Sequence, residues 1–169
     1  MDPIKTLLSA IKRIKEPRFF LTERGYQGQL ASEFDKLLDA EPATLDRPIV
    51  EQEYQKRAKA HGIRLRPDII VHIPYERGVS PTRRHDNYLV ILLKLSATQR
   101  KSEADFNKLS TICSILDYPI GVFVNVASTD LWLPHFADKF ADKANNSFVL
   151  HEFAVSLNGG HLHIRASAG

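Results

Sequence analysis

The chain has 169 residues, of which 43% are hydrophobic and 25% charged, as in a single globular domain with its own core. A formal charge of +3 and a pI of about 9.0 permit contact with nucleic acid without requiring it. The single cysteine excludes an intrachain disulfide and fits a cytoplasmic protein. No segment is long and apolar enough to span a bilayer, and we expect no signal peptide and no membrane contact.

Two helices are predicted at the start of the chain. The first covers residues 2–16, with Asp2 as its cap and Pro3 in its first turn. The second starts near Thr22, which is also a suitable cap, and ends before Pro42. Strands are predicted next, in the segments 48–56 and 66–74.

The segment 87–97, NYLVILLKLSA, reads as a strand buried on both faces, because six of the seven residues 89–95 are aliphatic. A helix over 102–118 follows, with Ser102 and Asp105 as its N-terminal signature. The rest of the chain predicts a buried strand, a helix that is broken near Pro134, and a β-hairpin that turns at NGG. These three elements cover residues 119–128, 131–144 and 147–167.

The predicted fold class is α/β, with a mixed central sheet flanked by helices. The order of elements is α, α, β, β, β, α, β, α, β, β, and the strand–helix–strand unit at 87–126 implies a right-handed parallel crossover. We expect one domain over residues 1–169. It would consist of an N-terminal helical extension (1–20), a core (21–128), and a C-terminal helix and hairpin (129–169).

Lys94 is the one charged residue in the apolar stretch 89–95, where lost hydration is costly unless a partner compensates. Side chains alternate along a strand, so Leu92 and Lys94 share one face, as do Asp68 and Ile70 on the preceding strand. An acid near the start of one strand could therefore meet a lysine near the end of its neighbour.

This layout resembles the PD-(D/E)xK nuclease superfamily, which has the restriction-endonuclease-like fold. The resemblance covers roughly residues 22–128. "RPDII" supplies Pro67 and Asp68, "LLK" supplies Lys94, and "TERGYQGQL" resembles the opening helix of many members, where an acid, here Glu23, points towards the metal site. "VEQEYQK" and "DFNKLSTICSILDYPIGVFV" resemble the strand before and the helix and strand after the motif.

The resemblance implies a hydrolase that cleaves a DNA phosphodiester with Mg²⁺, or with Mn²⁺, and a water nucleophile. Asp68 would hold the metal through oxygen, and Glu23 would assist the metal shell. Lys94 would polarise the water or the phosphate.

The sequence departs from the family at Leu92, where the family has an acidic residue or glutamine. Three explanations fit. The chain is a natural pseudonuclease, weak or inactive and without a metal, that binds DNA or acts as a scaffold; the second acid has moved, for example to Glu53; or leucine was introduced to silence a nuclease. A protein-interaction module without nucleic acid also stays open. We adopt the pseudonuclease as the working hypothesis.

Basic residues flank the predicted site strands, and arginine in particular suits phosphate contacts. A solvated loop surface explains them equally well. If the chain binds a partner, DNA is expected, and a homodimer or a larger protein complex is possible. The candidate nucleic-acid-binding residues are Arg66, Arg83, Arg84, Arg100 and Lys101.

Three histidines and the single cysteine are further candidates for chemistry. His161 and His163 alternate on the last strand, with His151 on its partner, but no cysteine or acid cluster joins them, so an exposed histidine face is predicted rather than a metal site. Cys113 lies on the apolar face of its helix and is predicted to be a buried, unreactive thiol.

Overall fold

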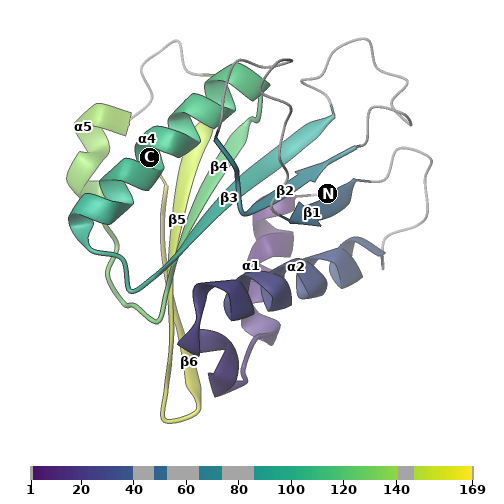
Figure 1. Cartoon of the computed structure of the whole chain (residues 1–169), viewed down its shortest axis with the longest axis vertical. Helices are drawn as coiled ribbons and strands as arrows, with labels where there is room; N and C mark the ends of the chain where they lie inside the picture. The colour runs from purple at the N-terminus through teal and green to yellow at the C-terminus, as the bar shows by residue number, and fades with distance from the viewer. Residues whose placement is uncertain (1, 40–47, 53–64, 74–85, 141–146, 169) are drawn as a thin grey trace.

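A computed structural model of the chain describes residues 2–39, 48–52, 65–73, 86–140 and 147–168. These residues form one six-stranded sheet with helices on both faces (Figure 1). The strands, in spatial as well as chain order, are β1 (Ile49–Gln52), β2 (Ile69–His72), β3 (Asn87–Leu95), β4 (Ile120–Val126), β5 (Val149–Asn158) and β6 (His161–Ala168). The helices are α1 (Pro3–Arg13), α2 (Glu23–Asp39), α4 (Gln99–Leu116) and α5 (Ala137–Phe140), with 3-10 helices η1 (Pro17–Leu21) and η3 (Leu133–Phe136).

The sheet is mixed, which confirms the predicted α/β class. β3, β4 and β5 run parallel, whereas β1, β2 and β3 pair antiparallel in sequence, as do β5 and β6. The predicted parallel crossover from β3 through α4 to β4 is present. Because β2 is antiparallel to β3, β2 begins beside the residues where β3 ends. We call this the carboxyl end of the sheet: the end at which β3, β4 and β5 stop and β2 begins.

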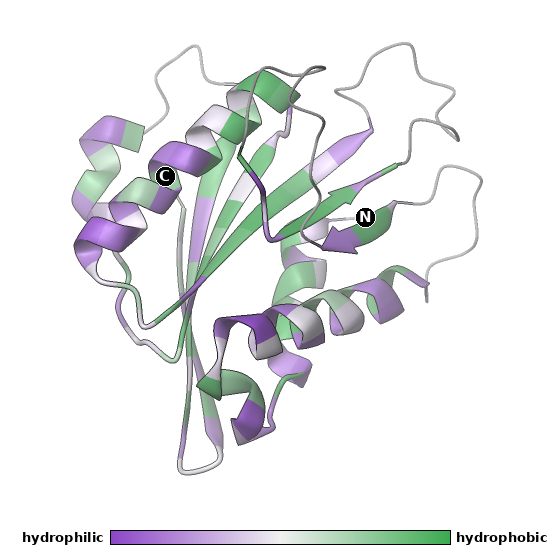
Figure 2. Ribbon diagram, viewed as in Figure 1, coloured by the Kyte–Doolittle hydropathy of each residue, from purple (hydrophilic) through white to green (hydrophobic). Residues whose placement is uncertain are grey.

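Two apolar layers hold the sheet between its helices. On one face, α1 and α2 cover side chains such as Ile69, Ile91 and Val124. On the other face, α4, η3 and α5 cover Ile70 and Val90, among others. Figure 2 shows hydrophobic strands between helices that carry hydrophilic residues on part of their surface. Burial of apolar side chains on both faces is the main source of stability for such a sheet.

The first two helices are capped as predicted. The Asp2 carboxylate accepts hydrogen bonds from the backbone N–H groups of Ile4 (3.1 Å) and Lys5 (3.2 Å). The Thr22 hydroxyl accepts one from the N–H of Gly25 at 3.0 Å. These bonds satisfy donors that have no partner within the helix. The cap at Thr22 makes Glu23 the first residue of α2.

The predicted start of the next helix is wrong. α4 begins at Gln99, with Thr98 as its N-cap, so Ser102 and Asp105 lie inside the helix and are buried. The N–H of Ser102 bonds to the carbonyl oxygen of Thr98 at 2.9 Å, as in a regular helical turn. These two polar residues resemble a cap in the sequence, but their side chains are buried against the sheet.

The C-terminal predictions hold in part. β5 and β6 form the expected hairpin, and Gly159 and Gly160 both have positive φ angles, of 56° and 80°, which a tight hairpin turn requires. The expected helix over 131–144 is η3 followed by α5; residues 141–144 lie outside the described residues, as does the part of the predicted first strand after Gln52. Among the residues described, no helix is long and apolar enough to cross a membrane.

Candidate functional site

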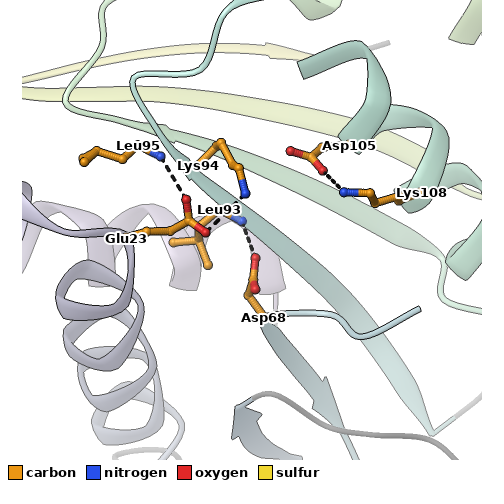
Figure 3. A network of polar contacts seen from close by, with 7 residues as sticks. All are labelled: Glu23, Asp68, Leu93, Lys94, Leu95, Asp105 and Lys108. Atoms are coloured by element: carbon orange, nitrogen blue, oxygen red, sulfur yellow. Dashed lines mark hydrogen bonds and ion pairs between the residues drawn. The ribbon is translucent and has the colours of Figure 1, made fainter. Parts of the chain in front are cut away.

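Lys94 is where β3 leaves the core. Residues 89–93 are buried, whereas the side chain of Lys94 is 36% exposed. Its ammonium group forms an ion pair with Glu23 Oε1 at 3.3 Å (Figure 3). The lysine therefore keeps part of its hydration and gains an acidic partner from α2, which accounts for a charge at the end of an apolar strand.

Asp68 lies immediately before β2 and is held by the backbone of β3. Its N–H donates to the carbonyl oxygen of Ile91 at 3.2 Å, and its Oδ2 accepts the N–H of Leu93 at 2.7 Å. Gln27 of α2 donates to the carbonyl oxygen of Asp68 at 2.9 Å. The carboxylate of Asp68 thus accepts a bond from the main chain next to Lys94, whereas the ammonium of Lys94 pairs with Glu23.

Glu23 connects α2 to the end of β3. Its Oε1 binds the Lys94 ammonium, and its Oε2 accepts the N–H of Leu95 at 3.3 Å. The structure therefore brings Glu23, Asp68 and Lys94 together at the carboxyl end of the sheet (Figure 3).

Burial raises the pKa of Asp68 to about 6 from its ordinary value of 3.8. The N–H of Leu93 and the ammonium of Lys94 lower it, whereas the negative charges of Glu23 and Asp105 raise it further. The effect of desolvation on the pKa of Asp68 is thus larger than the opposing effects of Leu93 and Lys94, so the negative charge of Asp68 is disfavoured in the folded protein.

Asp105 is a site residue that the sequence analysis missed. It is buried on the face of α4 that covers the sheet, and its Oδ1 accepts a bond from Lys108 Nζ at 2.6 Å. Figure 3 shows this pair near Asp68 and Lys94. Helical spacing offered a signal, because Asp105 precedes Leu109 of the apolar stripe by one turn.

The described residues do not fit a divalent cation. Leu92 offers no oxygen: its side chain is 5% exposed and packs in the apolar layer under α4. In the parts of the chain that the structure describes, no three histidine, cysteine, aspartate or glutamate side chains lie close enough together to hold a metal ion. Glu53, the expected replacement acid, lies outside the described residues.

Of the predicted phosphate-binding residues, three are described. Arg66 is exposed two residues before Asp68, and Arg100 and Lys101 are exposed in the first turn of α4. All three belong to segments at the carboxyl end of the sheet. Arg83 and Arg84 lie outside the described residues.

The histidines do not form one group. Pairing of β5 with β6 sets His163 opposite Ser156, on the face of the sheet that η3 covers. His151 lies on the other face, which it shares with Phe153 and Val155 of the layer under α1 and α2. His161 and His163 are exposed, as predicted. Cys113 is buried, as predicted, and burial raises the pKa of its thiol to about 12, so its lack of reactivity stays a prediction.

Comparison with known proteins adds no identification. No protein-family model matches the chain, and no curated protein matches it.

Proposed function

We propose that the chain is a degenerate nuclease-like domain of the PD-(D/E)xK superfamily, with a restriction-endonuclease-like fold, that binds DNA and cleaves it weakly or not at all. One observation carries the proposal: Glu23, Asp68 and Lys94 meet at one end of a mixed sheet, but their charges are used within the protein. Both oxygens of Glu23 and one of Asp68 already accept bonds from β3.

Two further features support weak or absent cleavage. A metal-dependent nuclease needs oxygen ligands that face a shared cation, and Leu92 removes one of them. The charge of Lys94 is neutralised by Glu23 rather than directed at a metal-bound water. Breaking these contacts to bind Mg²⁺ would cost the site its own hydrogen bonds.

Binding of DNA is supported by three exposed basic residues at the same end of the sheet, Arg66, Arg100 and Lys101. Phosphate contacts by such residues release counterions, so binding should weaken as the salt concentration rises. A protein-interaction module without nucleic acid would show no such dependence.

The binding experiment uses fluorescence anisotropy of labelled duplex and single-stranded DNA over a range of salt concentrations. We expect the double variant Arg100→Gln/Lys101→Gln to weaken binding and to reduce the slope of log Kd against log salt by about one per lost phosphate contact. The matched control is Lys12→Gln/Lys15→Gln, which removes two exposed lysines in or just after α1, on the other face of the sheet. Absence of salt-dependent binding by the unchanged chain would refute the proposal.

The cleavage experiment uses plasmid and single-stranded DNA with Mg²⁺ and with Mn²⁺. It compares the chain with Lys94→Ala, Leu92→Glu, and the double change Leu92→Glu/Lys94→Ala. We expect little or no cleavage by the chain. A gain on Leu92→Glu that is lost in the double variant would indicate a nuclease site disabled at one position. Cleavage by the chain that is lost on Lys94→Ala alone would contradict the proposal and favour a relocated acid.

Leu92→Glu needs a folding control, since it places a carboxylate among buried apolar side chains. Thermal unfolding of Leu92→Glu and of the neutral variant Leu92→Met distinguishes loss of the fold from loss of chemistry.

A further inference from the structure

A cavity of about 550 Å³ opens at the carboxyl end of the sheet, next to the site but without its three charged residues. Three segments line it: Ser96–Gln99 at the start of α4, residues 127–130 with Trp132 after β4, and Ser156 with Asn158 at the end of β5. In open α/β sheets, ligands bind beyond the carboxyl ends of the parallel strands.

The start of α4 supplies unused hydrogen-bond donors to this cavity. α4 has 18 residues, its N-cap Thr98 makes no side-chain bond to the first turn, and that turn contains no acid. Arg100 and Lys101 add positive charge at the positive end of the helix dipole, which is unfavourable unless an anion is near. A bound anion would satisfy the free N–H groups and offset this charge.

Ser156 is an independent indication of a ligand. It is 6% exposed, it lines the cavity, and its hydroxyl has no hydrogen-bond partner. Alternation along β5 places its side chain on the same face as Glu152, whose carboxylate binds the backbone of Trp132 in the cavity wall. Buried hydroxyls without a partner are rare and costly, so a ligand at this cavity floor would gain a donor that the protein leaves unused.

β6 extends the polar surface beside the cavity. Strand pairing sets His163 opposite Ser156 on the same face. The guanidinium of Arg165 donates to the carbonyl oxygen of Thr129, a lining residue, at 2.8 Å. Asp130 is the one acid among the described residues that line the cavity, and its charge opposes an anion, so its removal should strengthen binding.

Hydrogen bonds within the protein connect the segments that line the cavity. Asn125 is buried; its Oδ1 accepts the N–H of Ala97 at 2.8 Å, and its amide donates to the carbonyl oxygen of Asp130 at 3.2 Å. The indole N–H of Trp132 donates to the carbonyl oxygen of Ala97 at 2.9 Å, which fixes the ring. A fixed aromatic ring beside anion-binding groups suits a nucleotide, because bases stack on aromatic side chains.

We propose that this cavity binds the phosphate of a nucleotide unit, with the base against Trp132. The phosphate comes from the end of a DNA strand or from a free nucleotide, and the experiment separates these sources. The DNA version rests on the proposed function; the free-nucleotide version does not.

Trp132 is the only tryptophan of the chain, so its fluorescence reports on the cavity. The probes are inorganic phosphate, thymidine, thymidine 5′-monophosphate, and short oligothymidylates with and without a 5′-phosphate. We expect the monophosphate to bind more tightly than thymidine, and the phosphorylated oligonucleotide more tightly than the unphosphorylated one.

Variants test the assignment to this cavity. Ser156→Ala should weaken binding of the monophosphate by about tenfold, the value of a lost bond to a charged group. Arg100→Gln should weaken it by about two- to fivefold, and Asp130→Asn should strengthen it by a similar factor. Lys12→Gln, an exposed lysine on α1, should leave it unchanged. Thermal unfolding checks that each variant folds.

Failure of this inference differs from failure of the proposed function. If both oligonucleotides bind equally and Ser156→Ala has no effect on any probe, the cavity inference is wrong while DNA binding stands. If no oligonucleotide binds but the monophosphate binds in a Ser156-dependent manner, the cavity is a free-nucleotide site and DNA binding is wrong. Equal binding of thymidine and its monophosphate would overturn the cavity inference outright.

Discussion

The charged groups of Lys94 and Asp68 lie in different surroundings. Lys94 lies at the end of an apolar strand, but its ammonium reaches solvent and pairs with Glu23. Asp68 carries the cost of burial, and its pKa is raised although the backbone of Leu93 binds its carboxylate. Raised carboxylate pKa values are common at functional sites, where stability is given up for chemistry or binding.

Asp68→Asn should make the protein more stable at neutral pH. The folded-state pKa of about 6 lies above the ordinary value of 3.8, so the folded protein holds this proton more tightly than the unfolded chain. The free energy of unfolding therefore falls as the pH rises from about 4 through 6. Asparagine keeps an acceptor for the N–H of Leu93 and does not ionise. We expect a gain on the order of 2 kcal/mol above pH 6 and a flatter pH profile.

Urea unfolding at several pH values between 4 and 8 measures this difference. Asp138→Asn, at an exposed position of α5, is the matched control and should leave the pH profile unchanged. A loss of stability on Asp68→Asn at pH 8, or an unchanged pH slope, would show that burial does not dominate at Asp68.

At the scale of elements, close packing of α4 on the sheet depends on the absence of a side chain at Gly121 of β4. A Cβ atom there would lie 2.7 Å from Leu150 Cδ2 and 3.0 Å from Cys113 Sγ. Both distances are shorter than ordinary contacts between such atoms. The helix can therefore approach β4 closely only because residue 121 is glycine.

Gly121→Ala should lower the free energy of unfolding by about 1–3 kcal/mol, since the added methyl group overpacks the layer between α4 and the sheet. Gly28→Ala makes the same chemical change on α2, where a Cβ meets nothing within 4 Å. That control should stabilise the protein by roughly 0.5–1 kcal/mol, because alanine is the better helix former. Urea unfolding of both variants tests the pair, and equal effects of the same sign would contradict it.

At the scale of the whole molecule, the parallel order of β3, β4 and β5 places the candidate site and the cavity at the same end of the sheet. Both α2 and α4 begin at the carboxyl end of the sheet, and their first turns border the candidate site and the cavity. The opposite faces of the sheet are closed by apolar side chains. Cys113 belongs to this closed interior and therefore reports on opening of the fold.

The thiol of Cys113 should not react with a thiol reagent at pH 8 in the folded protein, because it is buried and its pKa is raised to about 12. Labelling should appear with urea at the same midpoint as the change in Trp132 fluorescence, as in two-state unfolding. Labelling well below that midpoint would reveal local opening of α4 from the sheet.

The sequence alone determined most of the elements, because their signals are local. Aliphatic runs predicted β3 and β4, Asp2 and Thr22 predicted the caps of α1 and α2, and NGG predicted the hairpin. Alternation along two strands predicted that Asp68 could meet Lys94 if the strands were neighbours; the antiparallel pairing that brings them together came from the structure. The start of α4 at Gln99 was missed, because Ser102 and Asp105 resemble the start of a helix in the sequence. In the structure they are buried inside α4, and Thr98 is the N-cap.

Only the tertiary structure decided which distant groups meet. It paired Lys94 with Glu23, brought Asp105 of α4 near Asp68, separated His151 from His163, and formed a cavity from three segments. These contacts depend on strand order, on pairing register and on which face each helix covers. No local periodicity encodes those choices, since they follow from packing the whole chain around one sheet.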